Sequence, residues 1–216
     1  DFPPLRASAG PSELGLRPVA GQVQRTQQPR LPACPREAAQ ASSLSSTAKM
    51  AVLPTATEGS VRSMKQVLFL CSANYYRSRF AEHLFNWLAG QEGLAWHADS
   101  RGLAVDQWGD IGEISHYTVD ALKDRGIPTA GPHRRPKHVT EADFDASDLV
   151  VAVKEAEHRA MMAAQFPLWT DCVQYWQIDD LDCAQPEESL PVLEEHVRAL
   201  VRRLSDEAGD ESSQAA

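Results

Sequence analysis

The feature that most constrains the fold of this 216-residue chain is an alternation, from residue 64 onward, of short apolar runs with segments that carry apolar side chains at helical spacing. Short, nearly continuous apolar runs suit strands that are buried on both faces of a sheet. Strands that alternate with helices are joined by right-handed crossovers and therefore run parallel. The sequence predicts an α/β fold, a doubly wound four-stranded parallel sheet with helices on both faces. We expect the strands at 66–70, 94–100, 148–153 and 173–178, and the helices at 78–88, 115–125, 155–165 and 190–204.

Composition divides the chain into three parts. Residues 1–63 are rich in Ala, Ser, Pro, Gln and Gly without sustained periodicity, which predicts a disordered N-terminal extension. Two origins fit this segment: upstream or added sequence, which we favour, or a targeting peptide. Residues 64–205 form the predicted domain, which is long enough to bury one sound core. Residues 206–216 are expected to be a flexible acidic tail.

Charge and cysteine content exclude several classes of function. After residue 64 the chain carries 14 basic and 26 acidic residues, and so acidic a surface repels nucleic acids. No stretch reaches the ~20 apolar residues that a membrane span needs. The four cysteines have the spacing neither of a disulfide framework nor of a zinc site. We therefore expect a cytoplasmic protein without metal or cofactor, and without nucleic-acid or membrane partners.

The loop between the first predicted strand and the first predicted helix carries the candidate chemistry. In parallel α/β sheets, ligands bind at the carboxyl ends of the strands. Backbone N–H groups of such a loop, together with the positive end of the helix dipole, cradle an anion. The loop is Cys71-Ser72-Ala73-Asn74-Tyr75-Tyr76-Arg77-Ser78.

Two side chains of this loop define its expected reaction. Arg77 offers a planar fork that binds two phosphate oxygens at once. Cys71 is expected to be a thiolate near neutral pH, because a helix N-terminus and a nearby cation favour that form, and Ser78 can donate a hydrogen bond to it. A nucleophile inside a phosphate cradle implies a covalent phosphocysteine intermediate.

The stretch VLFLCSANYYRSRFAEHLF resembles the signature of the low-molecular-weight protein tyrosine phosphatase family, whose loop reads Cys-x-Gly-Asn-x-x-Arg-Ser and often continues Ala-Glu. The resemblance covers about residues 65–205 and implies a flavodoxin-like strand order. It also implies that the hydroxyl of Ser100 holds Asn74 in place, and that the segment ending at Asp180 carries the general acid. The matching loop positions are Cys71, Asn74, Arg77, Ser78, Ala81 and Glu82.

The chain departs from the family pattern at four points. The loop glycine is Ala73, which would be strained if this position needs a positive φ and tolerable if it only lies close to the ligand. Tyr76 stands where many members have a second cysteine, and Arg79 replaces a proline. The segment Asp180-Leu181-Asp182 replaces Asp-Pro followed by aromatics. These departures keep the chemistry possible and bear on the preference for tyrosine-phosphorylated proteins.

The leaving alkoxide or phenoxide needs a proton, and three acids follow the last predicted strand. Alignment of Trp176 and Ile178 with the family favours Asp180 over Asp179, with Asp182 third. The same side chain would later activate the water that hydrolyses the phosphocysteine. A basic run at 133–138 either attracts an anionic substrate or, as we favour, is a solvated loop.

We therefore predict a cysteine-dependent phosphomonoester hydrolase that acts on a phosphorylated protein or a small aryl phosphate, such as phosphotyrosine. The first alternative is an arsenate reductase of the same fold. Residues 126–150 lack the cysteines of a thiol relay, although Cys183 lies beside the acid loop. The second alternative is a catalytically weak phosphate-binding regulatory module, against which the retention of Cys71, Arg77 and an acid argues.

Overall fold

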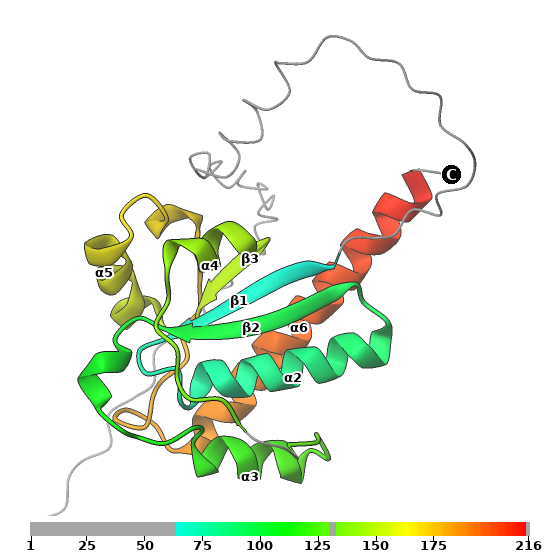
Figure 1. The fold of residues 1–216 in the computed structure, drawn as a ribbon. Coiled ribbons are helices and arrows are strands. Elements are labelled where there is room, and N and C mark those ends of the chain that lie inside the picture. The colour runs from blue at the N-terminus through cyan, green and yellow to red at the C-terminus, as the bar shows by residue number, and fades with distance from the viewer. Residues whose placement is uncertain (1–63, 130–132, 215–216) are drawn as a thin grey trace, which may run out of the picture. The chain divides into compact units, whose positions relative to one another are not determined.

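The computed structural model describes residues 64–129 and 133–214, whose strands form a parallel sheet in the order β2-β1-β3-β4 (Figure 1). This order and the strand directions confirm the predicted doubly wound α/β fold. The predicted extension at 1–63 lies outside the described residues. The strands are β1 Lys65–Cys71, β2 Trp96–Gly102, β3 Leu149–Ala152 and β4 Gln174–Tyr175.

Helices cover both faces of the sheet. Helices α2, α3 and α6 lie on one side of it, and α4 and α5 lie on the other (Figure 1). Short 3₁₀ helices at Val105–Trp108 and Thr170–Cys172 lie in the connections. The α-helices are α2 Arg77–Glu92, α3 His116–Asp124, α4 Glu141–Ala146, α5 Glu155–Gln165 and α6 Pro186–Gln214.

The central strand β1 contributes to two hydrophobic cores at once. Val67 and Phe69 belong to the core that contains α2 and α6, whereas Leu68 and Leu70 belong to the core that contains α4 and α5. All four side chains are fully buried. A strand with two buried faces has no polar alternation, which explains the continuous apolar run in the sequence. Parallel pairing with β2 and β3 sets the register of β1 and places Cys71 at its carboxyl end, opposite Gly102 of β2.

The C-terminal helix corrects one expectation. Helix α6 continues to residue 214, so residues 206–214 are helical rather than a flexible tail. The apolar stripe ends at Leu204, which is why the sequence predicted a stop there. Beyond it, the backbone is supported by helix-forming residues, by an ion pair between Arg203 and Glu207, and by a 2.7 Å hydrogen bond from Ser205 to Glu92 of α2.

Helix α4 is the element that the sequence did not predict. It is too short to show an apolar period, but its N-terminus carries a capping box. The Thr140 hydroxyl accepts a hydrogen bond from the Asp143 backbone N–H, and the Asp143 carboxylate accepts one from the Thr140 backbone N–H. In addition, the edge strand β4 forms ladder pairs only at 174–175, so it is shorter than the strand predicted at 173–178.

Two further observations concern the chain as a whole. No helix within the described ranges is both long and apolar enough to cross a membrane. Cys71 is a buried free thiol and Cys183 an exposed one.

Candidate active site

The loop that follows β1 turns tightly into α2, which begins at Arg77. Asn74 has a φ of 53°, the only positive φ among the described non-glycine residues. Asparagine tolerates this left-handed conformation better than most side chains. The positive φ therefore falls on Asn74 and not on Ala73, so the alanine that replaces the family's glycine is not strained.

The end of β2 packs directly behind this loop. A Cβ atom on Gly102 would lie 2.7 Å from the Ser72 carbonyl oxygen and 3.0 Å from the Asn74 nitrogen. Contacts that short require glycine, because both partners are backbone atoms that cannot move away. The N–H of Ala104 donates to the same Ser72 carbonyl at 2.9 Å. The loop is thus supported from behind by backbone, and its inner face is free for a ligand.

Cys71 lies at the base of the loop, and only 3% of the residue is exposed. Its Sγ lies 3.0 Å from the Ser78 hydroxyl, and the backbone N–H of Asn74 donates to it at 3.2 Å. Donors that point at a sulfur stabilise a negative charge on it. This arrangement suits a nucleophilic thiolate, and it places the Ser78 hydroxyl where the sequence predicted it.

Asn74 ties the loop to β2 and to the segment before α4. Its amide nitrogen donates to the hydroxyls of Ser78, at 3.1 Å, and Ser100, at 2.8 Å. Its amide oxygen accepts hydrogen bonds from Arg134, at 2.8 Å, and from the Lys137 backbone N–H, at 2.9 Å. All four bonds of the side-chain amide are therefore made. The predicted role of Ser100 as a support for Asn74 agrees with this geometry.

Arg134 corrects the interpretation of the basic run at 133–138 as a solvated loop. Its guanidinium donates not only to Asn74 but also to the Ser100 carbonyl at 2.8 Å, to Glu82 at 2.9 Å and to Asp99 at 3.0 Å. The Ser100 hydroxyl donates to the same Glu82 carboxylate at 2.5 Å. A planar fork with five donors suits such a meeting point. Arg134 thus holds three separate segments against the back of the loop.

Arg77 is almost fully buried, with 1% of its side chain exposed. Its Nη1 donates to the Ile178 carbonyl at 3.0 Å, and its Nη2 contacts Glu157 at 3.1 Å and Asp180 more closely still. Burial opposes its charge, but the charges of Cys71, Asp180 and Glu157 outweigh burial and raise the pKa of Arg77. The guanidinium therefore stays positive, and its place beside Cys71 in the lining of one pocket suits an anionic ligand.

Glu157 and His158 belong to the site although sequence reasoning did not find them. The Lys154 backbone N–H donates to Nδ1 of His158 at 3.0 Å, so the ring proton sits on Nε2, which faces the Ser72 hydroxyl at 3.2 Å. That hydroxyl in turn bonds the Glu157 carboxylate. Burial lowers the pKa of His158 and keeps the ring neutral.

The charge of Glu157 follows from these contacts. Burial alone would raise its pKa, but hydrogen bonds from His158 and Ser72 and the charge of Arg77 outweigh burial and hold the pKa well below its usual range. A detectable signal was present: both residues lie in the first turn of α5, which follows the carboxyl end of the buried strand β3.

The acid loop after β4 brings Asp180, and not Asp179, to the arginine. Asp180 contacts Arg77 and lines the pocket, whereas Asp179 is 57% exposed and pairs with Lys154 at 3.2 Å. Asp182 lies at the rim of the same pocket. This pocket has a volume of about 550 Å³. Its lining residues are Cys71, Ala73, Tyr75, Tyr76, Arg77, Trp108, Ile111, Glu157, Asp180, Leu181 and Asp182.

The predicted residues divide into two groups. Those in the lining of the pocket face a ligand, while Ser72, Asn74, Ser78 and Ser100 lie behind it and support the loop. Tyr76 does both, because its ring lines the pocket and its hydroxyl lies 3.1 Å from the Ser189 hydroxyl. Within the described ranges, no group of three or more His, Cys, Asp or Glu side chains is placed to hold a metal ion.

A parallel α/β sheet whose first loop presents a buried cysteine and a buried arginine to one pocket defines a cysteine-dependent phosphatase. The sequence model described as low molecular weight phosphotyrosine protein phosphatase matches residues 66–208. The chain belongs to this family.

Named relatives agree. The chain is 30% identical over 107 residues to the protein-arginine-phosphatase of Bacillus subtilis, which is 50% of this chain and 67% of that protein. It is 31% identical over 97 residues to the low molecular weight phosphotyrosine protein phosphatase of Sus scrofa, which is 44% of this chain and 58% of that protein. The matched stretch thus spans little more than half of the Sus scrofa protein.

Solved structures extend the likeness to whole domains. The structure of YfkJ from Bacillus subtilis has a TM-score of 0.59 and 26% identity, and the match covers 68% of this chain and 98% of YfkJ. A YwlE mutant from the same organism has a TM-score of 0.56 and 25% identity, over 65% of this chain and 99% of YwlE.

Proposed function

We propose that this chain hydrolyses phosphomonoesters through a phosphocysteine, with Cys71 as nucleophile, Arg77 as phosphate clamp and Asp180 as general acid. The observation that carries the proposal is that these three side chains, from three separate segments, line one pocket. Family membership favours this reaction over arsenate reduction and over a module that only binds phosphate.

The first step would form a sulfur–phosphorus bond and break the phosphorus–oxygen bond of the ester. The Cys71 thiolate attacks phosphorus while Arg77 and the loop N–H groups hold the phosphate oxygens. Asp180 gives its proton to the leaving oxygen. Asp180 contacts the arginine fork, so a phosphate group competes for the same donors. Once displaced from Arg77, Asp180 takes up a proton from solvent, and this is the proton that it gives to the leaving oxygen. Asp180 lies on a surface loop with 27% of its side chain exposed, which leaves it room to give way.

The second step would return the enzyme to its starting state. Asp180, now a carboxylate, takes a proton from water, whose oxygen attacks phosphorus. The sulfur–phosphorus bond breaks and inorganic phosphate leaves. The Ser78 hydroxyl, 3.0 Å from the sulfur, stabilises the thiolate as it reforms.

The intermediate can be trapped. An Asp180→Ala protein mixed with para-nitrophenyl phosphate should accumulate phosphocysteine, because this leaving group departs without a proton while the second step lacks its base. Mass spectrometry of the acid-quenched protein should show one phosphoryl group on the peptide that contains Cys71. A wild-type protein that releases para-nitrophenol with no such adduct in either protein would exclude the covalent route.

Phosphotyrosine is the substrate that we propose first. The rings of Tyr75, Tyr76 and Trp108 line the pocket beside the nucleophile and suit an aryl group. Phosphoarginine is the second candidate, favoured by one observation. Two carboxylates, Glu157 and Asp180, lie beside the phosphate site, and carboxylates suit the N–H groups of a guanidinium.

The two substrates are separated by one variant. We expect wild type to have a higher kcat/KM for a phosphotyrosine peptide than for a phosphoarginine peptide. Any effect of Glu157→Gln that acts through Arg77 is common to both substrates. If phosphoarginine is the substrate, this variant should therefore lower kcat/KM for phosphoarginine about tenfold more than kcat/KM for phosphotyrosine, the size of one charged hydrogen bond. An arsenate-reduction assay in parallel, with thiol supplied, should yield no arsenite.

We also propose that the protein works in the cytoplasm, because a nucleophilic Cys71 must stay reduced. Fractionation of cells that express the full chain tests this. Recovery of the protein outside the cytoplasmic fraction would contradict it.

A further inference from the structure

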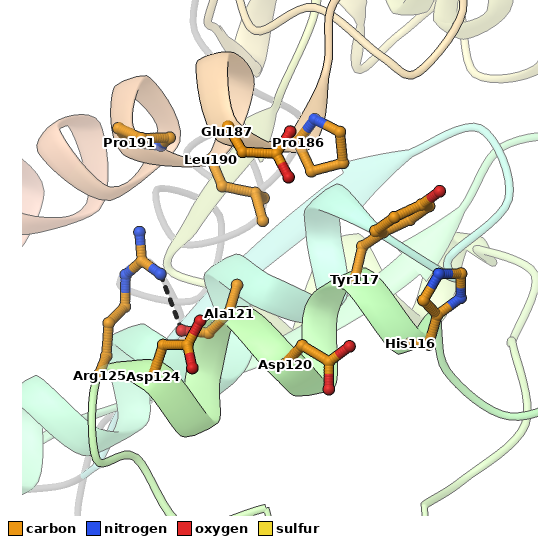
Figure 2. A pocket seen from close by; sticks show the side chains of 10 residues that line it. All are labelled: His116, Tyr117, Asp120, Ala121, Asp124, Arg125, Pro186, Glu187, Leu190 and Pro191. Carbon is orange, nitrogen blue, oxygen red and sulfur yellow. Dashed lines mark hydrogen bonds between the residues drawn. The ribbon is translucent and has the colours of Figure 1, made fainter.

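A second hollow lies beside the catalytic pocket, between α3 and the first turns of α6 (Figure 2). Its volume is about 320 Å³. The floor is apolar: Leu190 and Pro186 are buried, Ala121 is half-buried, and Tyr117 rises from α3 toward the start of α6. We call this hollow the α3–α6 groove.

The α3–α6 groove adjoins the catalytic pocket at two places. On one side, the ring of Tyr117 meets the ring of Tyr76 edge to face, with centroids 6.3 Å apart, and the Thr118 hydroxyl donates to the Tyr76 carbonyl at 3.1 Å. On the other side, the loop that carries Leu181 of the catalytic pocket leads directly into α6, and Glu187 in the first turn of α6 lines the groove. A bound chain can therefore pass from the pocket into the groove over Tyr117, which is 39% exposed.

The walls of the groove carry unbalanced negative charge. Asp120, Asp124 and Glu187 are exposed and have no ion-pair partner among the described residues. The one Lys or Arg in the lining is Arg125, and its guanidinium is already occupied. It pairs with Glu194 at 2.5 Å and donates to the Ala121 carbonyl at 2.8 Å, the bond dashed in Figure 2.

This combination differs from an ordinary acidic surface. The whole domain is acidic, so exposed carboxylates alone indicate no ligand. Here they border an apolar floor that lies next to the catalytic pocket, across the contact between Tyr117 and Tyr76. A segment with an apolar side chain and a cation would bury the first on Leu190 and pair the second with the free carboxylates.

We propose that the α3–α6 groove binds the stretch of a phosphorylated protein substrate that flanks the phosphorylated residue, and that it selects flanks with Lys or Arg beside an apolar residue. The proposal rests on the proposed phosphatase function of the adjoining pocket. It predicts a preference that a small aryl phosphate cannot report, because such a molecule does not reach the groove.

The test uses two phosphotyrosine peptides that differ only in their flanks, one with lysines and one with glutamates, together with phenyl phosphate. Wild type should prefer the lysine peptide in kcat/KM by about 5- to 30-fold, which is what three exposed charge pairs can supply. The triple variant Asp120→Asn, Asp124→Asn, Glu187→Gln should reduce the preference to below about twofold and leave phenyl phosphate turnover unchanged.

A matched control removes three carboxylates from α6 outside the groove, by Glu195→Gln, Asp206→Asn and Asp210→Asn, all at exposed positions. It changes the net charge equally and should keep the preference. Retention of the preference in the groove variant, or its equal loss in the control, would overturn the proposal.

A binding measurement separates this proposal from the proposed function. Dissociation constants of the same peptides, measured on a Cys71→Ser background, report the groove without turnover. If wild type fails to hydrolyse phenyl phosphate, the phosphatase mechanism is wrong. Binding alone then tests the groove proposal. It is supported if the groove variant loses the difference in dissociation constant between the two peptides, and contradicted if the variant keeps that difference.

Discussion

The phosphate loop, residues 71–78, and the acid loop, which follows β4 and carries Asp180, meet at Arg77 but are built in opposite ways. In the phosphate loop, Cys71, Asn74 and Arg77 are at most 3% exposed. Three of the four hydrogen bonds of the Asn74 side chain go to residues far away in the sequence. In the acid loop, apart from its contact with Arg77, Asp180 is held by its own neighbours. Its side chain accepts a hydrogen bond from the Leu181 backbone N–H at 2.8 Å, and its carbonyl accepts one from the Cys183 backbone N–H at 2.9 Å.

The difference teaches where rigidity is needed. An anion cradle works only if its donors already point inward before the ligand arrives, since reorienting them would consume binding energy. A general acid must approach the leaving group and then turn to water, so it tolerates an exposed loop. Changes behind the phosphate loop should therefore affect stability and activity together. Changes in the acid loop should affect activity alone.

Removal of the nucleophile should have the largest effect. Cys71→Ser should lower turnover of para-nitrophenyl phosphate by about 10⁴- to 10⁶-fold, as for other nucleophiles that act in a concerted unit. Calorimetric titration should still show binding of vanadate, because the cradle consists largely of backbone donors and Arg77. Residual turnover above about 1% of wild type would contradict the nucleophilic role.

Asp180→Asn should slow phenyl phosphate hydrolysis by about 10²- to 10⁴-fold, because phenoxide needs a proton to depart. The loss should be smaller for para-nitrophenyl phosphate, and the melting temperature should stay within about 2 °C of wild type, since the loop is exposed. Asp179→Asn is the matched control, because Asp179 pairs outside the pocket with Lys154. If the control is the damaging variant, Asp179 is the acid.

Arg134 tests the support behind the phosphate loop. Arg134→Ala would leave Glu82 and Asp99 without a shared partner, so unfolding free energy should fall by about 1–3 kcal/mol. Loss of the hydrogen bond from Arg134 to Asn74 should also lower kcat/KM by about tenfold, because the loop is then positioned less precisely. Urea melts and steady-state kinetics measure both.

The neighbouring Arg135 supplies the control. Its side chain is 68% exposed and pairs with Asp110, which is 71% exposed, so Arg135→Ala should change stability by less than about 0.5 kcal/mol. Equal effects of the two variants would show that Arg134 does no more than an exposed surface charge.

Glu157→Gln should have the smallest effect on the free energy of unfolding, and the size of this effect should depend on pH. Because the pKa of Glu157 is lowered in the folded protein, its carboxylate stabilises the fold at neutral pH. This contribution declines as pH falls below the unfolded value of about 4.3. Wild type should therefore exceed Glu157→Gln in unfolding free energy at pH 7, by about 1 kcal/mol, and the gap should narrow at pH 3.5. A gap that widens toward acid would contradict the assignment of charge.

The interpretation of the sequence succeeded where structure depends on near neighbours. The run at 66–70 predicted β1, and the bounds of α5 were predicted as 155–165, the residues at which the structure has them. The placement of Cys71 and Arg77 in a strand–loop–helix junction follows from those local patterns. Prediction was weaker at β4 and α4, which are short and take their form from neighbouring segments.

By itself, the sequence determined the sheet, its first loop and the position in that loop of the two side chains to which we assign the proposed reaction, Cys71 and Arg77. Alternation of apolar runs and helical segments is a property of adjacent residues, and so is the position of Cys71 between a strand and a helix. The family resemblance favoured Asp180 over Asp179, but only the tertiary structure showed that Asp180 meets Arg77. It alone showed that Arg134 supports the loop and that Glu157 and His158 lie at the site. These contacts join residues 60 to 103 positions apart. Their partners are chosen by strand order and by the burial of charge, which no local pattern encodes.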